Sequence, residues 1–496
     1  MARVKRPNAD PAPAAPHGTT EVLDTAQAGG LVLRGGALRF IGFAASTALS
    51  LGGVALVTRQ LGVVDYGRYQ TIISLMTIVG AVTDAGMATL GVREYAQRSG
   101  ADRDALMRTL LGLRLVLTCA GAFLAAGIAA AAGYGASLVL GTVLAGIGLV
   151  LTVLQTTLSI PLGATLRNGS LAALDVLRQA LTVAGFAVLA LLGGSVVAFL
   201  GVPVPVGVVV LVAVWALVRR ELPMTPAFDP RAWRVLLRAA VAFAAATAVG
   251  TIYTYTAQVL TSFVASEQEA GLFAAAFRTF VVVASVSGLL VTVAFPVLAR
   301  AARDDAVRLA YAMQRVFETS AILGVGASLA TIVGAPGVIR VMAGADYDGA
   351  VGPLRIVAIT LLASFVVAPW GFGLLSLHRH RGLLLANAAA LAVSMVAVGV
   401  LASRHGAEGA AVGTVLGETT LAIGYLVALT AGRADLRPRF GRPFRAVLAA
   451  GPGLLLLAAP LPSIPAAIVA VGLYAAALVL LRAVPDELFD LLPVRS

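Results

Sequence analysis

The chain has 496 residues, of which 59% are hydrophobic and only 12% are charged, and its mean hydropathy is +0.93. A soluble domain carries about 25% charged residues, so this composition excludes an ordinary soluble protein. The formal net charge of +12 comes almost entirely from Arg, because Lys5 is the only lysine. We interpret the Arg excess as the charged side of a membrane protein rather than as a nucleic-acid-binding surface.

Residues 1–36 are rich in Pro and Ala and lack periodicity, which predicts a disordered cytoplasmic tail. No apolar core precedes the first full-length span, so we do not expect a signal peptide. Apolar runs follow, each close to the roughly 20 residues that cross a bilayer. We predict fourteen membrane spans, at residues 37–57, 70–92, 109–132, 136–158, 171–193, 196–218, 239–264, 273–296, 316–338, 354–376, 382–402, 409–431, 446–463 and 466–482.

The basic residues between these spans are distributed very unequally between the two sides of the membrane. One side carries 28 of them and the other carries five, while three fall inside spans. Because Lys and Arg are enriched in cytoplasmic loops, we predict that both termini are cytoplasmic. The fold class that we expect is therefore an all-α protein that crosses the membrane many times.

Two matching helix junctions indicate an internal repeat. Residues 65–69 read Asp-Tyr-Gly-Arg-Tyr and residues 269–273 read Glu-Ala-Gly-Leu-Phe, so both place an acid before Gly-x-aromatic. The two glycines, Gly67 and Gly271, are 204 residues apart, and this interval holds six predicted spans. Because the number of spans in the interval is even, both halves have the same orientation in the membrane. This predicts a parallel repeat with a cavity between the halves. We expect six-helix bundles at 37–238 and 239–445, followed by two extra helices and a cytoplasmic tail at 446–496.

The predicted outer loops are too short to hold a catalytic domain. The longest are 58–69 and 339–353, and their only acids are Asp65, Asp346 and Asp348. A nucleotide-binding P-loop needs a lysine, and the only lysine lies in the tail. The single Cys119 excludes a Cys-based zinc cluster and an intrachain disulfide. We therefore expect neither an enzyme nor a metal or cofactor site.

Ionisable side chains inside predicted spans are candidates for function, because charge is costly at membrane depth. Asp84 lies in the second span, Arg278 in the eighth and Glu418 in the twelfth. Each is a candidate for the substrate cavity. The alternative is a structural partner, which for Asp84 would be Arg114, or, for Arg278, a head group that reaches the outer surface.

Two further arginines, Arg59 and Arg93, lie at the ends of predicted helices. A guanidinium group forms paired hydrogen bonds with phosphate oxygens, so either residue could meet a pyrophosphate headgroup. The alternative is an ordinary arginine at the membrane surface. Asp175 and Arg178 are three residues apart on one helix face, and we expect them to form a structural pair.

A polar stretch in the seventh span contains Tyr253, Tyr255 and Gln258 among several threonines. Such a stretch should face a partner helix or a water-filled cavity rather than lipid. Aromatic faces and amides suit sugar recognition, and helix packing through small polar residues is the equal alternative.

Several short motifs within about residues 37–431 have the order and spacing of the motifs of a known protein family. In the first half they are Arg59-x-Leu61-Gly62, Tyr66-Gly67-x-Tyr69, Asp84-x-Gly86 and Arg93-Glu94. In the second half they are Gly271-x-Phe273, Ala276-x-Arg278, Phe295-Pro296-x-Leu298-x-Arg300, Gly344-x-x-Tyr347, Pro353-Leu354-Arg355, Asn387 and Gly406 to Ala411 with Thr414 and Glu418. These motifs resemble the polysaccharide-transporter, or oligosaccharide flippase, family of the multidrug/oligosaccharidyl-lipid/polysaccharide exporter superfamily. Relatives often carry an acidic residue near the positions of Ala257 and Gln258. Because this chain lacks that acid, we do not expect it to couple transport to cations through this position.

The resemblance implies two six-helix bundles arranged in a V around a central cavity. It also implies a flippase that moves undecaprenyl-diphosphate-linked oligosaccharide across the bacterial plasma membrane by alternating access, for cell-surface polysaccharide biosynthesis. The partners we expect are this lipid-linked substrate, membrane lipids and the polysaccharide polymerase machinery. A cation-coupled drug or metabolite antiporter of the same superfamily, a lipid II flippase and a membrane polymerase or ligase are the alternatives.

Overall fold

The computed structural model describes residues 26–484 apart from residues 85, 166, 220–224 and 305, and it describes only the backbone at 26–44, 239–247 and 289–306. Every element in this part of the chain is a helix, as the sequence predicts. The α-helices are α1 (Ala26–Asp84), α2 (Met87–Gln97), α3 (Gly100–Ala131), α4 (Ala136–Leu158), α5 (Ile160–Ala164), α6 (Asn168–Leu191), α7 (Val196–Gly201), α8 (Pro203–Val218), α9 (Pro230–Val264), α10 (Glu267–Asp304), α11 (Ala306–Met342), α12 (Val351–Ser376), α13 (His380–Thr430), α14 (Gly441–Ala449), α15 (Gly451–Leu454) and α16 (Ser463–Leu480). Three short 3-10 helices are η1 (Ala345–Ala350), η2 (Ala434–Leu436) and η3 (Leu455–Ala458).

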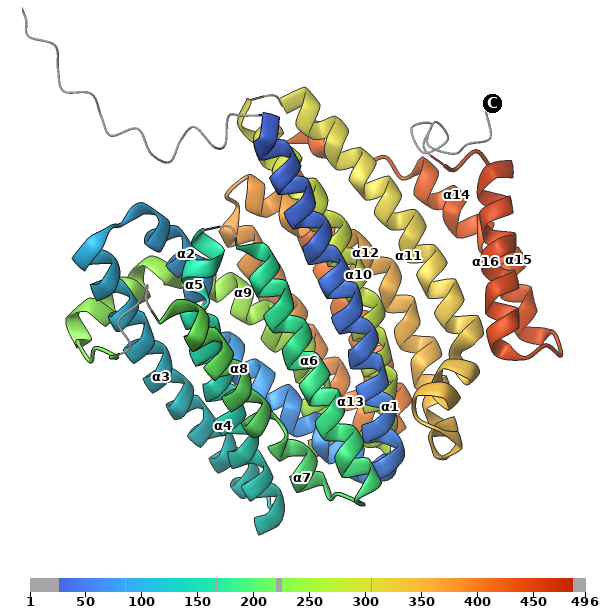
Figure 1. Cartoon of the computed structure of the whole chain (residues 1–496). Coiled ribbons are helices and arrows are strands. Elements are labelled where there is room, and N and C mark those ends of the chain that lie inside the picture. The colour runs from blue at the N-terminus through green and yellow to red at the C-terminus, as the bar shows by residue number, and fades with distance from the viewer. Residues whose placement is uncertain (1–25, 85, 166, 220–224, 305, 485–496) are drawn as a thin grey trace, which may run out of the picture.

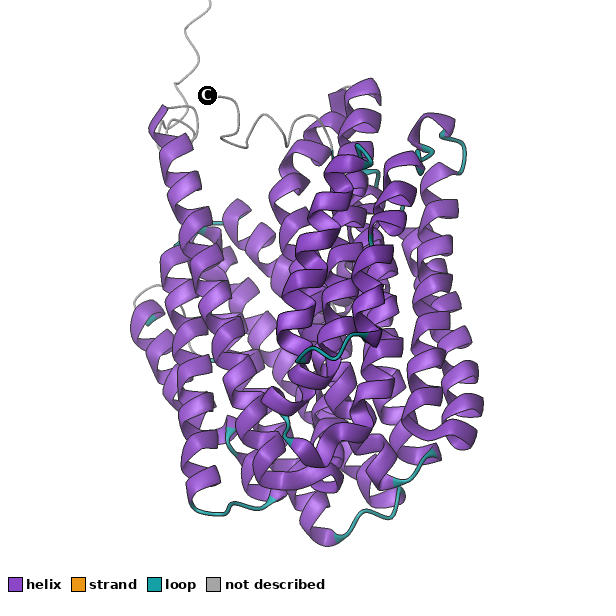
Figure 2. Cartoon of the chain, turned by 90° about the vertical axis from the view of Figure 1, so that its right-hand side faces the viewer, coloured by secondary structure: helices purple, strands orange, loops and turns teal. Residues whose placement is uncertain are grey.

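Ten helices in the described residues are long and apolar enough to cross a membrane. They run side by side, and loops at the top and the bottom of the molecule connect many of them (Figure 2). The multi-pass fold class is therefore confirmed, but the count of fourteen spans is not. The difference arises partly because two of the ten helical segments, with 53 and 51 residues, each cover most of two predicted spans.

The predicted turns between these paired spans are bends within continuous helices. The expected loop 58–69 is helical on both sides of Gly62, whose φ of 70° and ψ of 179° interrupt α1. In α13 the interruption falls at Gly406, whose φ of 54° suits glycine because it has no Cβ. The Glu269 carboxylate accepts a hydrogen bond from the backbone N–H of Ala407 at 2.7 Å. The start of α10 therefore caps the second part of α13.

The structure differs from the predicted N-terminal tail of residues 1–36 over its last residues. Residues 26–36 belong to α1, because the apolar sequence Leu31-Val32-Leu33 extends the first helix toward the N-terminus. The remainder of that tail, residues 1–25, and the predicted C-terminal tail from residue 485 lie outside the described residues. The boundaries of the two bundles at 238 and 445 stay predictions.

The helices form two groups that meet along α1 and α10. Helices α2 to α8 gather on one side of the molecule, and α10 to α12 lie on the other (Figure 1). A single buried apolar cluster joins the groups, since it contains Tyr66 and Phe199 from the first half and Phe273 and Phe277 from the second. This shared core packs the two groups of helices against each other.

The last helices pack against α11, on its side away from the first group (Figure 1). Ile322, Leu329, Ala446 and Ala470 belong to one buried cluster at this contact. The Tyr474 hydroxyl donates a hydrogen bond to the carbonyl of Ile322 at 2.7 Å. The described contacts of these last helices with α11 are packing contacts.

Candidate functional site

The two groups of helices are joined tightly on the face opposite the beginning of α1 and the end of α16 (Figure 1). A Cβ atom added to Gly67 would lie 2.8 Å from the Gly271 Cα, and one added to Gly271 would lie 2.0 Å from the Val63 carbonyl oxygen. Only glycine permits such a close approach. Beside the glycines, Arg68 forms an ion pair with Glu267 at 2.8 Å. The two glycines that indicated the repeat thus meet at the contact between its halves.

Arg59, a predicted phosphate ligand, lies at the same contact. Its Nη2 donates a hydrogen bond to the Val341 carbonyl at 2.8 Å, and the neighbouring Thr58 hydroxyl donates to the Met342 carbonyl at 2.7 Å. The Tyr347 hydroxyl donates in turn to the Thr58 carbonyl at 3.2 Å. Arg59 therefore joins α1 to the end of α11 and lines none of the cavities described below. We refer to this set of contacts as the closed face.

Gly271→Ala is expected to weaken the closed face, because the new methyl group would overlap the Val63 carbonyl. Spin labels on Asp65→Cys and Gln268→Cys, in a Cys119→Ser background, should then give longer and broader distances in pulsed electron paramagnetic resonance. Gly288→Ala is the matched control on α10, since no described atom outside the backbone of that helix lies within 4 Å of its added Cβ. Unchanged distances in Gly271→Ala would show that the glycine contact does not control closure.

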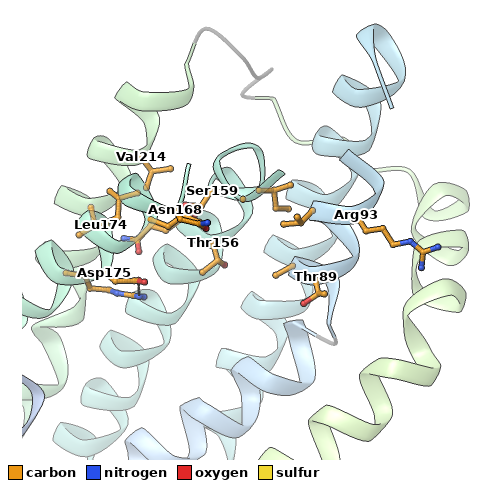
Figure 3. A pocket seen from close by; sticks show the side chains of 16 residues that line it. Thr89, Arg93, Thr156, Ser159, Asn168, Leu174, Asp175 and Val214 are labelled. Carbon is orange, nitrogen blue, oxygen red and sulfur yellow. Dashed lines mark hydrogen bonds and ion pairs between the residues drawn. The ribbon is translucent and has the colours of Figure 1, made fainter. Parts of the chain in front are cut away.

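A polar cavity of about 680 Å³ lies among α2, α4, α5, α6 and α8 in the first group (Figure 3). Arg93, another predicted phosphate ligand, is exposed, and its guanidinium points away from Thr156 and Asp175 (Figure 3). The Asp175–Arg178 pair, at 2.7 Å, also lines this cavity. The polar lining side chains are those of Thr89, Arg93, Gln155, Thr156, Ser159, Asn168, Asp175 and Arg178.

Asp84 pairs with Arg114, the partner that the sequence suggested. Arg114 is only 2% exposed, whereas the Asp84 side chain is 33% exposed. Arg114 also donates to the hydroxyl of Thr157 at 2.7 Å and to that of Thr156 at 3.2 Å. Its Nε has no hydrogen-bond partner in the part of the chain that the structure describes. Because Thr156 also lines the polar cavity, this network links the ion pair to the cavity wall.

Glu418 lies in the second group, at a smaller cavity of about 170 Å³. Its carboxylate accepts hydrogen bonds from the Tyr253 hydroxyl at 2.7 Å and the Ser364 hydroxyl at 2.8 Å. Ser394 and Thr414 line the same cavity. No described basic side chain forms an ion pair with Glu418, which is 8% exposed. The site is a buried carboxylate that accepts hydrogen bonds from two hydroxyl groups.

Arg278 lies between the two groups, in a cavity of about 160 Å³ bounded by α1, α6 and α10. Its guanidinium donates to the Ser50 hydroxyl at 3.0 Å. Gln70 and Gln179 line the cavity, as does Tyr66, whose buried hydroxyl has no hydrogen-bond partner among the described residues. Arg278 makes no ion pair with a carboxylate in that part of the chain. These groups leave hydrogen-bonding capacity for an anionic ligand.

The remaining candidates from the seventh predicted span have packing contacts. Tyr255 meets Phe277 edge-on, with ring centroids 6.2 Å apart. Gln258 is fully buried, and its amide nitrogen lies 3.5 Å from the Thr71 hydroxyl and 3.4 Å from the Ala270 carbonyl. The structure therefore places Arg93 at the polar cavity, Tyr253 and Glu418 at the Glu418 cavity and Arg278 in its own cavity. The other predicted residues contact neighbouring protein groups; they are Arg59, Asp84, Tyr255 and Gln258.

The sequence did not single out the uncharged polar side chains of the polar cavity. Gln155, Thr156, Ser159 and Asn168 come from the end of α4, the turn after it and the start of α6. Polar residues at helix ends are typical of caps, so nothing in the pattern marked them as a binding surface. Only the packing of α2, α4, α6 and α8 brings them together.

Comparison with known proteins identifies the family. A family model described as polysaccharide biosynthesis protein matches residues 56–352. Because the match covers more than half of the chain, this chain belongs to that family, as the motifs predicted. No curated protein sequence gives a significant match.

Solved structures with a similar fold are membrane transporters. The lipid II flippase MurJ in an inward closed conformation aligns with a TM-score of 0.75 at 13% identity, over 92% of this chain and 99% of that chain. An inward-facing multidrug resistance transporter of the MATE family aligns with a TM-score of 0.62 at 15% identity, over 79% and 94%. A MOP-superfamily transporter from Pyrococcus furiosus gives 0.56 at 15% identity, over 82% and 95%. At these identities the likeness concerns the fold.

Proposed function

We propose that this protein is a flippase that moves undecaprenyl-diphosphate-linked oligosaccharide between the leaflets of a bacterial plasma membrane. Its membership of the polysaccharide biosynthesis family and its transporter fold support this assignment. The observation that carries the proposal is the Arg278 cavity, where an arginine that has no carboxylate partner among the described residues lies at the boundary between the two groups of helices. A diphosphate crossing the membrane needs such a cation, because unpaired charge is costly there.

The proposed mechanism is alternating access. The prenyl chain stays on the apolar outer side of the protein, in contact with lipid, while the diphosphate and sugars cross between the two groups of helices. The closed face blocks one end of this route through the Gly67–Gly271 contact and the Arg68–Glu267 ion pair. The Arg distribution in the loops supports cytoplasmic termini, which would make the closed face extracytoplasmic. Opening that face and closing the opposite one would release the substrate on the outside, for use by polysaccharide polymerase machinery.

The proposal is tested with the purified full-length protein in liposomes that contain undecaprenyl-diphosphate-linked oligosaccharide. A sugar-modifying enzyme added outside the liposomes reports how fast substrate from the inner leaflet becomes accessible. We expect access to rise to nearly all of the substrate with wild type and to stop at the outer-leaflet pool without protein. Equal access with and without the protein would reject the flippase proposal.

A second candidate function is a cation-coupled drug or metabolite antiporter, and the Glu418 site favours it. A buried carboxylate among hydroxyl groups, without a basic partner in the described chain, could bind and release a proton or Na⁺ during transport. Under this candidate function, Glu418→Gln should abolish the stimulation of transport by an imposed proton or Na⁺ gradient. Glu408→Gln, which changes another carboxylate of α13, is the control. Stimulation that persists in Glu418→Gln would reject coupling through this residue.

A further inference from the structure

Two cavities of opposite character follow one another along α6 and α8. The polar cavity includes Asp175 and Arg178 of α6 and Val210 of α8. A second cavity of about 530 Å³, which we call the apolar groove, lies on the same two helices and on α7. Its lining includes Leu181, Val188, Leu189, Val202, Val206 and Val209.

The two cavities are neighbours along the helix axes. Arg178 lines the polar cavity and Leu181 lines the apolar groove, so about one helical turn, or roughly 4.5 Å of axial rise, separates them on α6. On α8 the adjacent residues Val210 and Val209 line the polar cavity and the groove respectively. A molecule longer than one helical turn could therefore reach both sites at the α6–α8 boundary.

The apolar groove suits a hydrocarbon chain. All its lining residues are Leu, Val, Ala, Gly or Pro, and none has a polar side chain. Val188 is 54% exposed and Val209 is 49% exposed, so the groove is accessible from outside. The helices come close beneath it, since a Cβ added to Gly185 would lie 2.9 Å from a Val202 methyl group. The groove is thus open at the protein surface, and the helices at its base are tightly packed.

The polar cavity suits a saccharide better than a bare phosphate headgroup. Its charged lining is Arg93, Asp175 and Arg178, but the Arg93 guanidinium points away from Asp175 (Figure 3) and Arg178 is already paired with Asp175 at 2.7 Å. Thr156 and Asn168 add hydroxyl and amide groups that both donate and accept hydrogen bonds. Sugar hydroxyls need this mixture, whereas a phosphate group seeks unpaired cations. The volume of about 680 Å³ lies within the usual range of ligand pockets.

We infer that α6 and α8 form a loading site for the lipid-linked saccharide, with sugar in the polar cavity and the prenyl chain in the apolar groove. This inference rests on the proposed function and adds where the substrate is held. The carrying observation is the polarity change along one helix pair, which matches an amphiphile with a sugar-bearing head and a hydrocarbon chain. Gln179, next to Arg178, lines the Arg278 cavity, so α6 would lie between the loading site and that cavity.

The test uses the full-length protein in nanodiscs of phosphatidylethanolamine and phosphatidylglycerol. The probe is undecaprenyl-diphosphate N-acetylglucosamine with a diazirine in its prenyl chain, and mass spectrometry maps the photolabelled peptides. We expect labels within residues 181–189 and 202–209. The variant Val188→Trp/Val209→Trp fills the groove and should lower this labelling about tenfold. Val208→Trp is the matched control, because Val208 is 47% exposed on α8 but does not line the groove.

Mapping on wild type does not depend on whether the tryptophan variants fold. Labels elsewhere, or equal groove labelling by phosphatidylglycerol with a diazirine in its acyl chain, would overturn the loading site, and the second result would identify ordinary bilayer lipid as the occupant. The liposome translocation assay separates this failure from a failure of the proposed function. If wild type translocates substrate but the groove is not labelled, only the loading site is rejected. If wild type does not translocate, both are rejected.

Discussion

Arg278→Gln is expected to lower the initial rate of oligosaccharide translocation in liposomes by about tenfold to a hundredfold. The estimate follows from losing a hydrogen bond to a charged group, which contributes roughly 1.5–3 kcal/mol, where about 1.4 kcal/mol corresponds to a factor of ten. The loss should be functional rather than structural. Arg278 has one hydrogen bond to a described protein group, with Ser50 at 3.0 Å, and no carboxylate in that part of the chain is left unpaired by its removal.

Two further variants sharpen this prediction. Arg278→Lys keeps the charge but loses the paired donors of the guanidinium, so we expect an intermediate rate. Arg340→Gln is the control, because Arg340 is 65% exposed and pairs with Asp348 outside the cavities. Thermal unfolding in detergent should be nearly the same for all these proteins. A wild-type rate in Arg278→Gln would remove this residue from the transport route.

Asp84→Asn is expected to destabilise the fold by about 3–5 kcal/mol, the range measured when one partner of a buried ion pair is removed. The reason is that Arg114, at 2% exposure, would keep a buried charge without its counterion. Arg114→Met should cost less, since Met fills much of the space and Asp84, at 33% exposure, can be hydrated. Chemical denaturation of the purified protein in mixed micelles measures both changes.

The double variant Asp84→Asn/Arg114→Met supplies the decisive comparison. It removes both charges, so it should be more stable than Asp84→Asn alone although it carries one more substitution. Asp348→Asn is the control, because it breaks an exposed ion pair with Arg340 and should cost about 1 kcal/mol or less. A double variant that is less stable than Asp84→Asn would contradict the account of a buried arginine charge.

The apolar runs predicted the helices well because membrane spans need long stretches without charge. The positions of the turns were less predictable. Gly62 and Gly406 bend long helices without ending them. Apolar runs flank a bend within one helix and a loop between two helices alike, so the sequence does not distinguish the two. The match between Gly67 and Gly271 was more informative, because both positions require glycine for the same contact.

The candidate site was predictable only in its rare charges. Asp84, Arg278 and Glu418 stood out because ionisable groups seldom occur inside spans, and each has a specific polar partner in the structure. Their separation could not be deduced, since it depends on which helix faces meet: Arg278 and Glu418 line two different cavities, whereas Asp84 pairs with Arg114. Asp175 and Arg178 form the pair that their spacing predicts, yet they also line the polar cavity. Helical spacing predicts which residues are neighbours on one helix, but it does not predict a cavity that several helices form around them.

The most direct test of the central claim is the leaflet distribution of lipid-linked oligosaccharide in cells that lack this protein and any redundant flippase. We predict that the lipid accumulates on the cytoplasmic leaflet, measured with a sugar-modifying enzyme on right-side-out and inverted vesicles. Wild-type protein should restore it to the outer leaflet, and Arg278→Gln should not. A normal distribution without the protein would contradict the flippase account and favour the antiporter.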